Sequence, residues 1–81
     1  MNDDKTMVFN VESINEKVIY DTLKDVYDLL EERGYNATNQ IVGYILSGDL
    51  GYISNYKAAR NKINSLDRST ILEVMLKNFL R

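Results

Sequence analysis

The chain contains neither cysteine nor histidine among its 81 residues. Without cysteine it can form no disulfide, no thiolate metal site and no thiol nucleophile. Without histidine it lacks the side chain that most often serves as a general base and as a ligand for transition metals. Any catalysis would therefore depend on carboxylates, hydroxyls, lysine and arginine, and we predict no active site, no bound metal and no cofactor.

Long apolar runs are missing as well. A transmembrane helix needs about 20 consecutive apolar residues, and no segment of the chain comes near that composition. The start, Met1–Asp4, is acidic, whereas a secretory signal peptide starts with basic residues. We therefore expect a cytoplasmic protein that inserts no segment into a membrane.

The chain is also short for a domain without covalent cross-links. Its composition, 44% apolar and 27% charged, is typical of a folded domain. A domain of this length buries only about 60–65% of the surface that its unfolded chain exposes. Because disulfides are excluded, association of two copies is the natural way to enlarge the core. We expect a homodimer.

Proline is absent, so helix ends must be marked by glycine and by capping residues. Apolar residues recur every three or four positions, which predicts an all-α, compact four-helix domain over residues 13–81. Ser13 and Glu16 have the spacing of a capping box. They predict a first helix over residues 14–33, which ends before a left-handed Gly34.

A second helix is predicted over residues 37–47, because Asn36 can cap its start and Gly48 can end it. Its apolar residues surround most of its circumference, so we expect it to be buried on several sides. Gly43 lies in its middle, where glycine costs about 1 kcal/mol relative to alanine. A close approach of another helix, for example across a dimer interface, would explain the missing side chain.

A third helix is predicted over residues 55–65 and a last helix from about residue 69, after a joint at residues 66–68. Asp67 or Ser69 is expected to cap the last helix. The expected core stripe of that helix consists of Ile71, Leu72, Met75, Leu76 and Phe79.

The third helix is basic, and this supports an alternative function. Lys57, Arg60 and Lys62 follow a short turn after a helix, an arrangement loosely similar to a helix-turn-helix reader of DNA. The alternative is therefore a small dimeric nucleic-acid-binding regulator. The net charge of −2 and the few cations favour instead a basic face that pairs with the acidic first helix, so we expect no nucleic-acid partner.

The first 12 residues lack helical spacing and are expected to form a separate flexible or extended N-terminal segment, residues 1–12. Residues 6–11 are β-prone and would place their apolar side chains on one side if extended. Thr6 lies in this segment. A kinase binds its target as an extended chain, so a hydroxyl here would be more accessible than one in a helix.

Two parts of the chain are more specific than a helical pattern requires. The first is the start, Asp4-Lys5-Thr6-Met7 with Phe9. The second is a central set of residues: Gly34-Tyr35-Asn36, Asn39-Gln40-Ile41-Val42-Gly43-Tyr44, Ser47-Gly48-Asp49, Tyr52-Ile53 and Ala59-Arg60-Asn61. On these residues nearly the whole chain resembles the IreB family of small bacterial regulatory phosphoproteins.

The resemblance implies a cytoplasmic, helical and homodimeric protein of a Gram-positive bacterium, without enzymatic activity. It implies a membrane-anchored Ser/Thr kinase with extracellular PASTA repeats and a cognate phosphatase as partners, together with a downstream protein of unknown identity. The expected role lies in the cell-envelope stress response and in cephalosporin resistance. In the family, the threonine of Asp-x-Thr-x-x-Phe is phosphorylated, and Thr6 occupies that position here.

The resemblance also suggests which residues form the dimer interface. We expect family-motif residues to lie there, and refer to the following set as the motif residues: Asn39, Gln40, Gly43, Tyr44, Ser47, Gly48, Asp49, Tyr52, Arg60 and Asn61. The chain departs from the family pattern in the central loop, where Leu50-Gly51 and Ser54 replace proline-containing positions. The conformation of that loop is therefore left open by the resemblance.

Overall fold

The computed structural model of the chain describes the backbone of residues 11–81 and the side chains of residues 15–81. Within that range it contains four α-helices, one 3-10 turn and no strand. The elements are α1 (Val11–Glu32), α2 (Ala37–Ser47), η1 (Leu50–Tyr52), α3 (Ala59–Asn64) and α4 (Arg68–Phe79). The all-α, four-helix prediction is therefore confirmed, whereas the homodimer stays a prediction.

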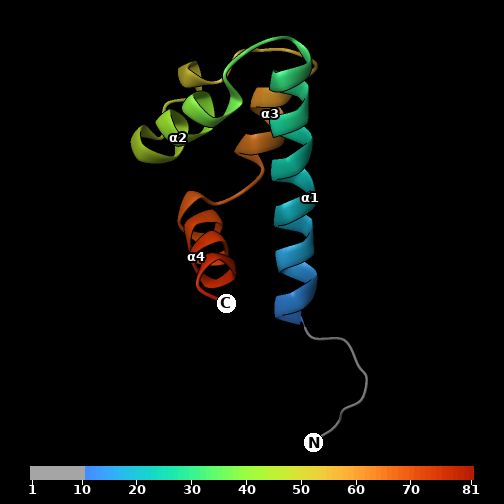
Figure 1. The fold of residues 1–81 in the computed structure, drawn as a ribbon, viewed down its shortest axis with the longest axis vertical. Helices are drawn as coiled ribbons and strands as arrows, with labels where there is room; N and C mark the ends of the chain where they lie inside the picture. The colour runs from blue at the N-terminus through green and yellow to red at the C-terminus, as the bar shows by residue number, and fades with distance from the viewer. Residues whose placement is uncertain (1–10) are drawn as a thin grey trace, which may run out of the picture.

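The long helix α1 is the element against which the other helices pack (Figure 1). The short helix α3 lies beside the C-terminal half of α1, and α4 lies beside its N-terminal half. Helix α2 also contacts α1 and holds η1 against itself. The two ends of α1 therefore contact different parts of the chain.

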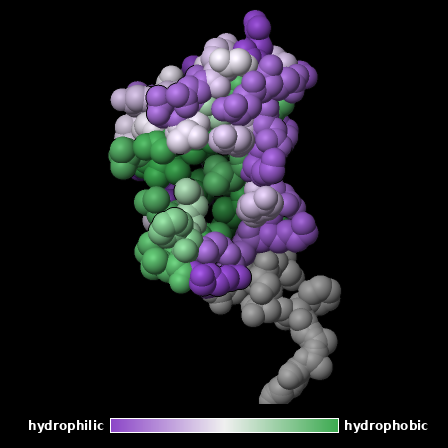
Figure 2. Space-filling view, in the orientation of Figure 1, coloured by the Kyte–Doolittle hydropathy of each residue, from purple (hydrophilic) through white to green (hydrophobic). Residues whose placement is uncertain are grey.

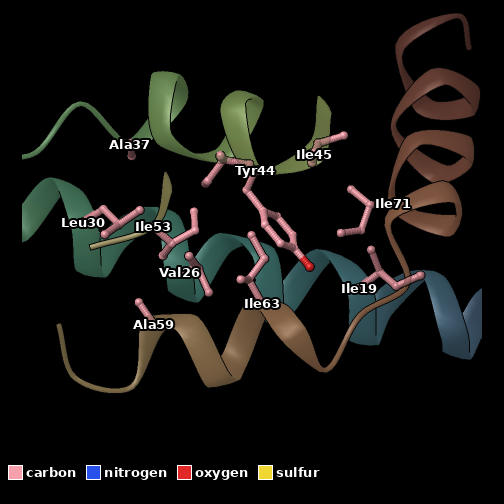
Figure 3. Packing of buried hydrophobic residues seen from close by; sticks show 11 residues of the cluster. Ile19, Val26, Leu30, Ala37, Tyr44, Ile45, Ile53, Ala59, Ile63 and Ile71 are labelled. Atoms are coloured by element: carbon pink, nitrogen blue, oxygen red, sulfur yellow. The ribbon is translucent and has the colours of Figure 1, made fainter. Parts of the chain in front are cut away.

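The core lies where α1, α2 and α3 meet, and α4 adds to it at one end (Figure 3). The ring of Tyr44 points from α2 toward Ile63 of α3, and Val26 of α1 lies beside them. The largest side chains with no exposed surface are Leu30, Ile53, Ile63, Ile71 and Val26. Since these come from α1, the segment after η1, α3 and α4, the core depends on four separate segments of the chain.

The predicted helix ends are largely confirmed. Gly34 and Gly48 have φ of +87° and +76°, the left-handed conformation that glycine adopts without strain. The Asn36 side chain accepts a hydrogen bond from the Asn39 backbone N–H at 3.1 Å, which caps α2. Asp67 caps α4 by accepting from the Thr70 N–H at 3.0 Å.

The start of α1 was predicted too late. The helix begins at Val11, so Ser13 lies inside its first turn instead of capping it. A cap contributes only about 1 kcal/mol, and Glu12 is an acidic residue that favours the start of a helix. Val11 is thus helical, whereas residues 1–10 of the predicted N-terminal segment, including Thr6, lie outside the described residues.

The start of α3 was also predicted too early. Lys57 and Ala58 have φ of 49° and 63°, a left-handed conformation that interrupts a right-handed helix. The preceding segment is held by the buried Ile53, whose carbonyl accepts a hydrogen bond from Arg60 Nε at 2.7 Å. This tertiary contact overrides the helical preference of residues 55–58, and α3 is reduced to Ala59–Asn64.

The apolar stripe of α4 does not form core as predicted. Ile71 is buried, but the other four residues of the stripe, Leu72, Met75, Leu76 and Phe79, are exposed. Helix α4 meets α1 through one edge only, where Ile71 and the half-buried Val74 pack. On α2, likewise, Val42 and Leu46 are exposed, so that helix is not covered on every side.

Candidate functional site

Some of the motif residues connect α2 to the segment that follows it in the chain. The Gln40 side chain makes two hydrogen bonds with Ser54: its Nε2 donates to Ser54 Oγ at 3.0 Å, and its Oε1 accepts from the Ser54 N–H at 2.9 Å. Tyr52 of η1 packs its ring on Gly43, where an added Cβ atom would overlap ring Cδ1. Gly43 therefore permits a close approach, but the contact is made within one chain.

The Ser-Gly-Asp part of the motif forms the end of α2 and the turn after it. Ser47 Oγ donates to the Gly43 carbonyl at 2.8 Å and accepts from the Asp49 N–H at 2.9 Å. Asp49 Oδ1 accepts from the Gly51 N–H at 2.8 Å, which caps η1. Arg68 Nη1 reaches over Gly48 from the start of α4 and donates to the Ile45 carbonyl at 2.8 Å.

The remaining motif residues are separated from one another. Tyr44 is buried in the core, Arg60 binds the Ile53 carbonyl, and Asn39 and Asn61 are exposed. Gln40, Gly43 and the Ser-Gly-Asp turn thus make contacts within one chain, and these contacts join α2 to the segment that follows it. That the motif residues also lie at a dimer interface stays a prediction.

Replacing Gly43 by alanine tests the contact with Tyr52. In the wild-type background we expect the free energy of unfolding to fall by about 1 kcal/mol, because the ring must leave its place. In a Tyr52→Ala background the same change should raise it by about 1 kcal/mol, because alanine favours a helix more than glycine does. Urea denaturation of the four proteins measures the difference.

Gly34→Ala is the matched control for this cycle. A Cβ atom at Gly34 meets nothing within 4 Å, but the φ of +87° strains it. Its effect should be destabilising and equal in both Tyr52 backgrounds, because the two sites share no contact. If Gly43→Ala also has the same effect in both backgrounds, the Tyr52 ring does not restrict position 43.

The acidic face of α1 is paired with lysines. Lys62 and Lys57 of the basic segment lie 2.9 Å from Asp25 and 3.2 Å from Glu32, respectively. A hydrogen bond from the Tyr56 hydroxyl, followed by Lys57, lowers the pKa of Glu32. The predicted pairing with the acidic first helix is therefore confirmed for Lys62 of α3 and for Lys57, which lies before α3, whereas Arg60 donates to the Ile53 carbonyl instead.

The described acidic side chains form no metal-binding cluster. Among the side chains that the structure describes, those of residues 15–81, no group of three or more acidic side chains has an arrangement that could hold a metal ion. Over residues 11–81, no helix combines the length and apolar composition required to cross a membrane.

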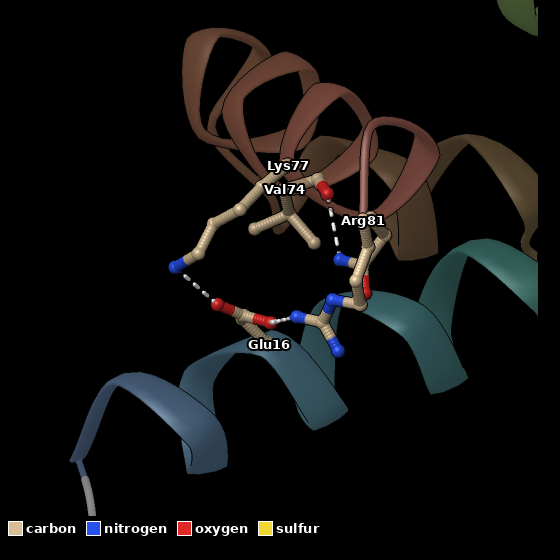
Figure 4. A network of polar contacts seen from close by, with 5 residues as sticks. Glu16, Val74, Lys77 and Arg81 are labelled. Carbon is tan, nitrogen blue, oxygen red and sulfur yellow. Dashed lines mark hydrogen bonds and ion pairs between the residues drawn. The ribbon is translucent and has the colours of Figure 1, made fainter.

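A second polar contact joins the ends of the described chain. Glu16 of α1 accepts from Lys77 Nζ of α4 at 2.7 Å, and Arg81 Nη2 lies 3.9 Å from its other carboxylate oxygen (Figure 4). We call Glu16, Lys77 and Arg81 the α1–α4 seam. Sequence reasoning missed it because Glu16 and Lys77 are 61 positions apart.

The seam affects the acidity of Glu16. The Lys77 hydrogen bond, with smaller contributions from Asn78 and Arg81, lowers the pKa of Glu16 below its ordinary value. A carboxylate with a lowered pKa stabilises the folded state above its ordinary pKa, and this stabilisation is lost as the pH falls through the lowered pKa. The seam therefore favours the contact between α4 and α1 more at neutral pH than in acid.

Farther along α1 from the seam, toward its C-terminal end, α1, α2 and α4 enclose an apolar groove of ≈ 290 Å³. Around it lie exposed apolar side chains, which Figure 2 shows as a continuous hydrophobic region over α2 and α4. We call this region the apolar face and define it by Tyr20, Tyr27, Val42, Leu46, Leu72, Met75, Leu76 and Phe79. Apolar patches of this kind usually mark a surface that another molecule covers.

The comparison with known protein families concerns nearly the whole chain. Residues 4–81 match the model of a family described as IreB regulatory phosphoprotein. The match includes the helices, the motif residues, the seam and the apolar face, and at its start it includes Thr6. With so much of its length matched, the chain belongs to the IreB family of regulatory phosphoproteins.

Proposed function

We propose that this protein is a non-enzymatic regulatory phosphoprotein controlled by phosphorylation of Thr6. Its kinase is a membrane-anchored Ser/Thr kinase of the PASTA type, and a cognate phosphatase removes the phosphate. The protein acts in the cytoplasm of a Gram-positive bacterium on a downstream protein, and it modulates the cell-envelope stress response and cephalosporin resistance. The observation that carries the proposal is the family match, which extends to residue 4 and therefore includes Thr6.

The positions of the other threonines support Thr6 as the acceptor. Thr22, Thr38 and Thr70 lie within α1, α2 and α4. The Thr70 hydroxyl also donates to Asp67 at 2.9 Å. A kinase that binds an extended substrate would have to unfold a helix to reach any of them.

Phosphorylation in vitro tests the proposal. We expect the cognate kinase to add one phosphate to the wild-type protein, and peptide mass spectrometry to place it on Thr6. The Thr6→Ala variant should take up none, whereas Thr6→Ser should still be phosphorylated because it keeps the hydroxyl. An unmodified wild-type protein, or a phosphate that persists in Thr6→Ala, would refute the assignment.

We propose further that two copies associate through the apolar face. Phe79 and Leu46 are 85% and 79% exposed, which is unfavourable for large apolar side chains in water. A stable interface buries about 800 Å² on each partner and has an apolar centre rich in aromatic residues and methionine. The apolar face has that composition, since it includes three aromatic side chains and Met75.

A further inference from the structure

Two hollows adjoin each other along α1. The first is the apolar groove of ≈ 290 Å³ between α1, α2 and α4, and the second, of ≈ 730 Å³, lies between α1 and α4. Both are lined by Tyr20, Leu23 and Met75, so they are continuous, and we call them together the long groove. Water in contact with apolar walls is unfavourable, and hollows of this size can hold several apolar side chains. The long groove therefore favours an apolar occupant.

Helix α4 carries side chains that suit such a groove. Its exposed apolar residues follow the spacing i, i+3, i+4 and i+7, which places them on one face of the helix: Leu72, Met75, Leu76 and Phe79. An amphipathic helix that enters an apolar groove of its partner presents this same spacing. We call these four residues the α4 stripe. The α4 stripe of another copy is thus a chemically suitable occupant of the long groove.

The groove and the stripe form one continuous surface. Met75 lines both hollows and also belongs to the α4 stripe. In a twofold dimer the same patch of both subunits meets itself, so each copy can fill the groove of the other at the same time. With about 100 Å² from each exposed side chain, the apolar face offers roughly the 800 Å² per partner that a stable interface buries. A second copy therefore fits the groove in both chemistry and area.

The positions of the two hollows favour one direction of pairing. Phe79 lies beside the larger hollow, at the C-terminal end of α4, whereas the smaller hollow is lined by Val42 and other residues of α2. In a parallel pair of α4 helices, the two Phe79 side chains would face each other and leave the smaller hollow empty. An antiparallel pair brings the Phe79 end of one copy toward the α2 end of the other.

We propose that the two α4 helices of the dimer lie antiparallel at the twofold axis, with Leu76 and Phe79 of each copy seated in the long groove of the other. This inference rests on the association through the apolar face proposed above, and it identifies the helix at the axis. The middle of the α4 stripe lies between Met75 and Leu76, so the axis passes close to Leu76. Phe79, which is 85% exposed in the single chain, is the aromatic anchor of the interface.

The absence of cysteine makes cross-linking a clean test, because a single introduced thiol reports one position. In Leu76→Cys, the two thiols of a dimer lie on either side of the axis, at a separation that a disulfide can bridge. Mild oxidation should convert this variant to covalent dimers at least about tenfold faster than Val18→Cys, because thiols within one complex react at a high effective concentration. Val18 is the matched control, since it is 53% exposed against 60% for Leu76 but lines neither hollow.

A mixture of two variants tests where Phe79 lies. Phe79→Cys and Val42→Cys chains each carry one thiol, so a short bismaleimide can join the two positions only between copies. The antiparallel pair predicts a mixed product that contains one chain of each kind, which peptide mass spectrometry identifies. A parallel pair predicts instead that Phe79→Cys alone is cross-linked to itself and that no mixed product forms.

The outcomes separate this inference from the proposals on which it rests. A dimer in which Leu76→Cys reacts no faster than Val18→Cys, or in which Leu46→Cys reacts instead, overturns the α4 pair but not the association itself. A monomeric wild type, measured by sedimentation, overturns both. If Leu76→Cys dissociates the dimer, Met75→Cys on the other side of the axis gives the answer. Neither result affects the phosphorylation of Thr6, which the kinase experiment decides by itself.

Discussion

Leu76→Glu is expected to weaken the proposed homodimer by at least about 100-fold, a loss of about 2.7 kcal/mol. Leu76 is 60% exposed on α4, within the apolar face. A buried carboxylate without a partner at the centre of an apolar interface is strongly unfavourable. Because Leu76 is not a core residue, the single chain should still fold. Sedimentation over a concentration series measures the dissociation constant, and circular dichroism checks the fold.

Val18→Glu provides the control for this experiment. Val18 is 53% exposed on α1, comparable to Leu76, but it lines neither the apolar groove nor the cavities beside α4. The same substitution there should leave the dissociation constant within about twofold of wild type. A Leu76→Glu chain that dimerises as the wild type does would place the interface elsewhere, and a monomeric wild type would refute the dimer.

Ile63→Ala is expected to lower the free energy of unfolding by about 3 kcal/mol. Ile63 has no exposed surface and lies among Val26, Tyr44 and Ile53, so its loss leaves a cavity between three segments of the chain (Figure 3). Natural domains are stable by only about 5–15 kcal/mol, and a domain of this size lies toward the low end. Thermal denaturation should show a midpoint lowered by about 12 °C or more.

Ile63→Val tests whether this loss reflects packing. It removes one methylene group and should lower the free energy of unfolding by about 1 kcal/mol. Equal and small losses for the two variants would mean that α3 can move into the space, and that its contact with α1 does not support the core. Both variants are measured at one protein concentration, because dimerisation would add to the apparent stability.

Local features of the chain were predictable because each depends on a few neighbouring residues. A left-handed glycine and an asparagine cap mark the ends of helices wherever they occur, so Gly34, Asn36 and Gly48 placed α2 correctly. The start of α3 was not predictable in this way. It depends on Arg60 binding the carbonyl of Ile53, a contact that forms only after the loop has packed.

In the candidate site, too, local features were predictable from the sequence and long-range contacts were not. Thr6 and the motif residues were identified from the sequence, since they form a recognisable pattern along the chain. Their neighbours were not: the pattern indicates neither that Tyr52 covers Gly43 nor that Lys77 reaches Glu16. Contacts between residues 61 positions apart depend on the angle between α1 and α4, which no local rule determines.

The amino-acid sequence by itself determined that the protein is helical, where α2 begins and ends, and that it resembles the IreB family. These properties follow from spacing, capping and residue identity, which act over a few positions. Only the tertiary structure decided which apolar side chains of α2 and α4 remain exposed, and which cations lie next to Glu16. Helical spacing indicates that a face is apolar, but only the packed arrangement of helices determines whether the same chain covers it.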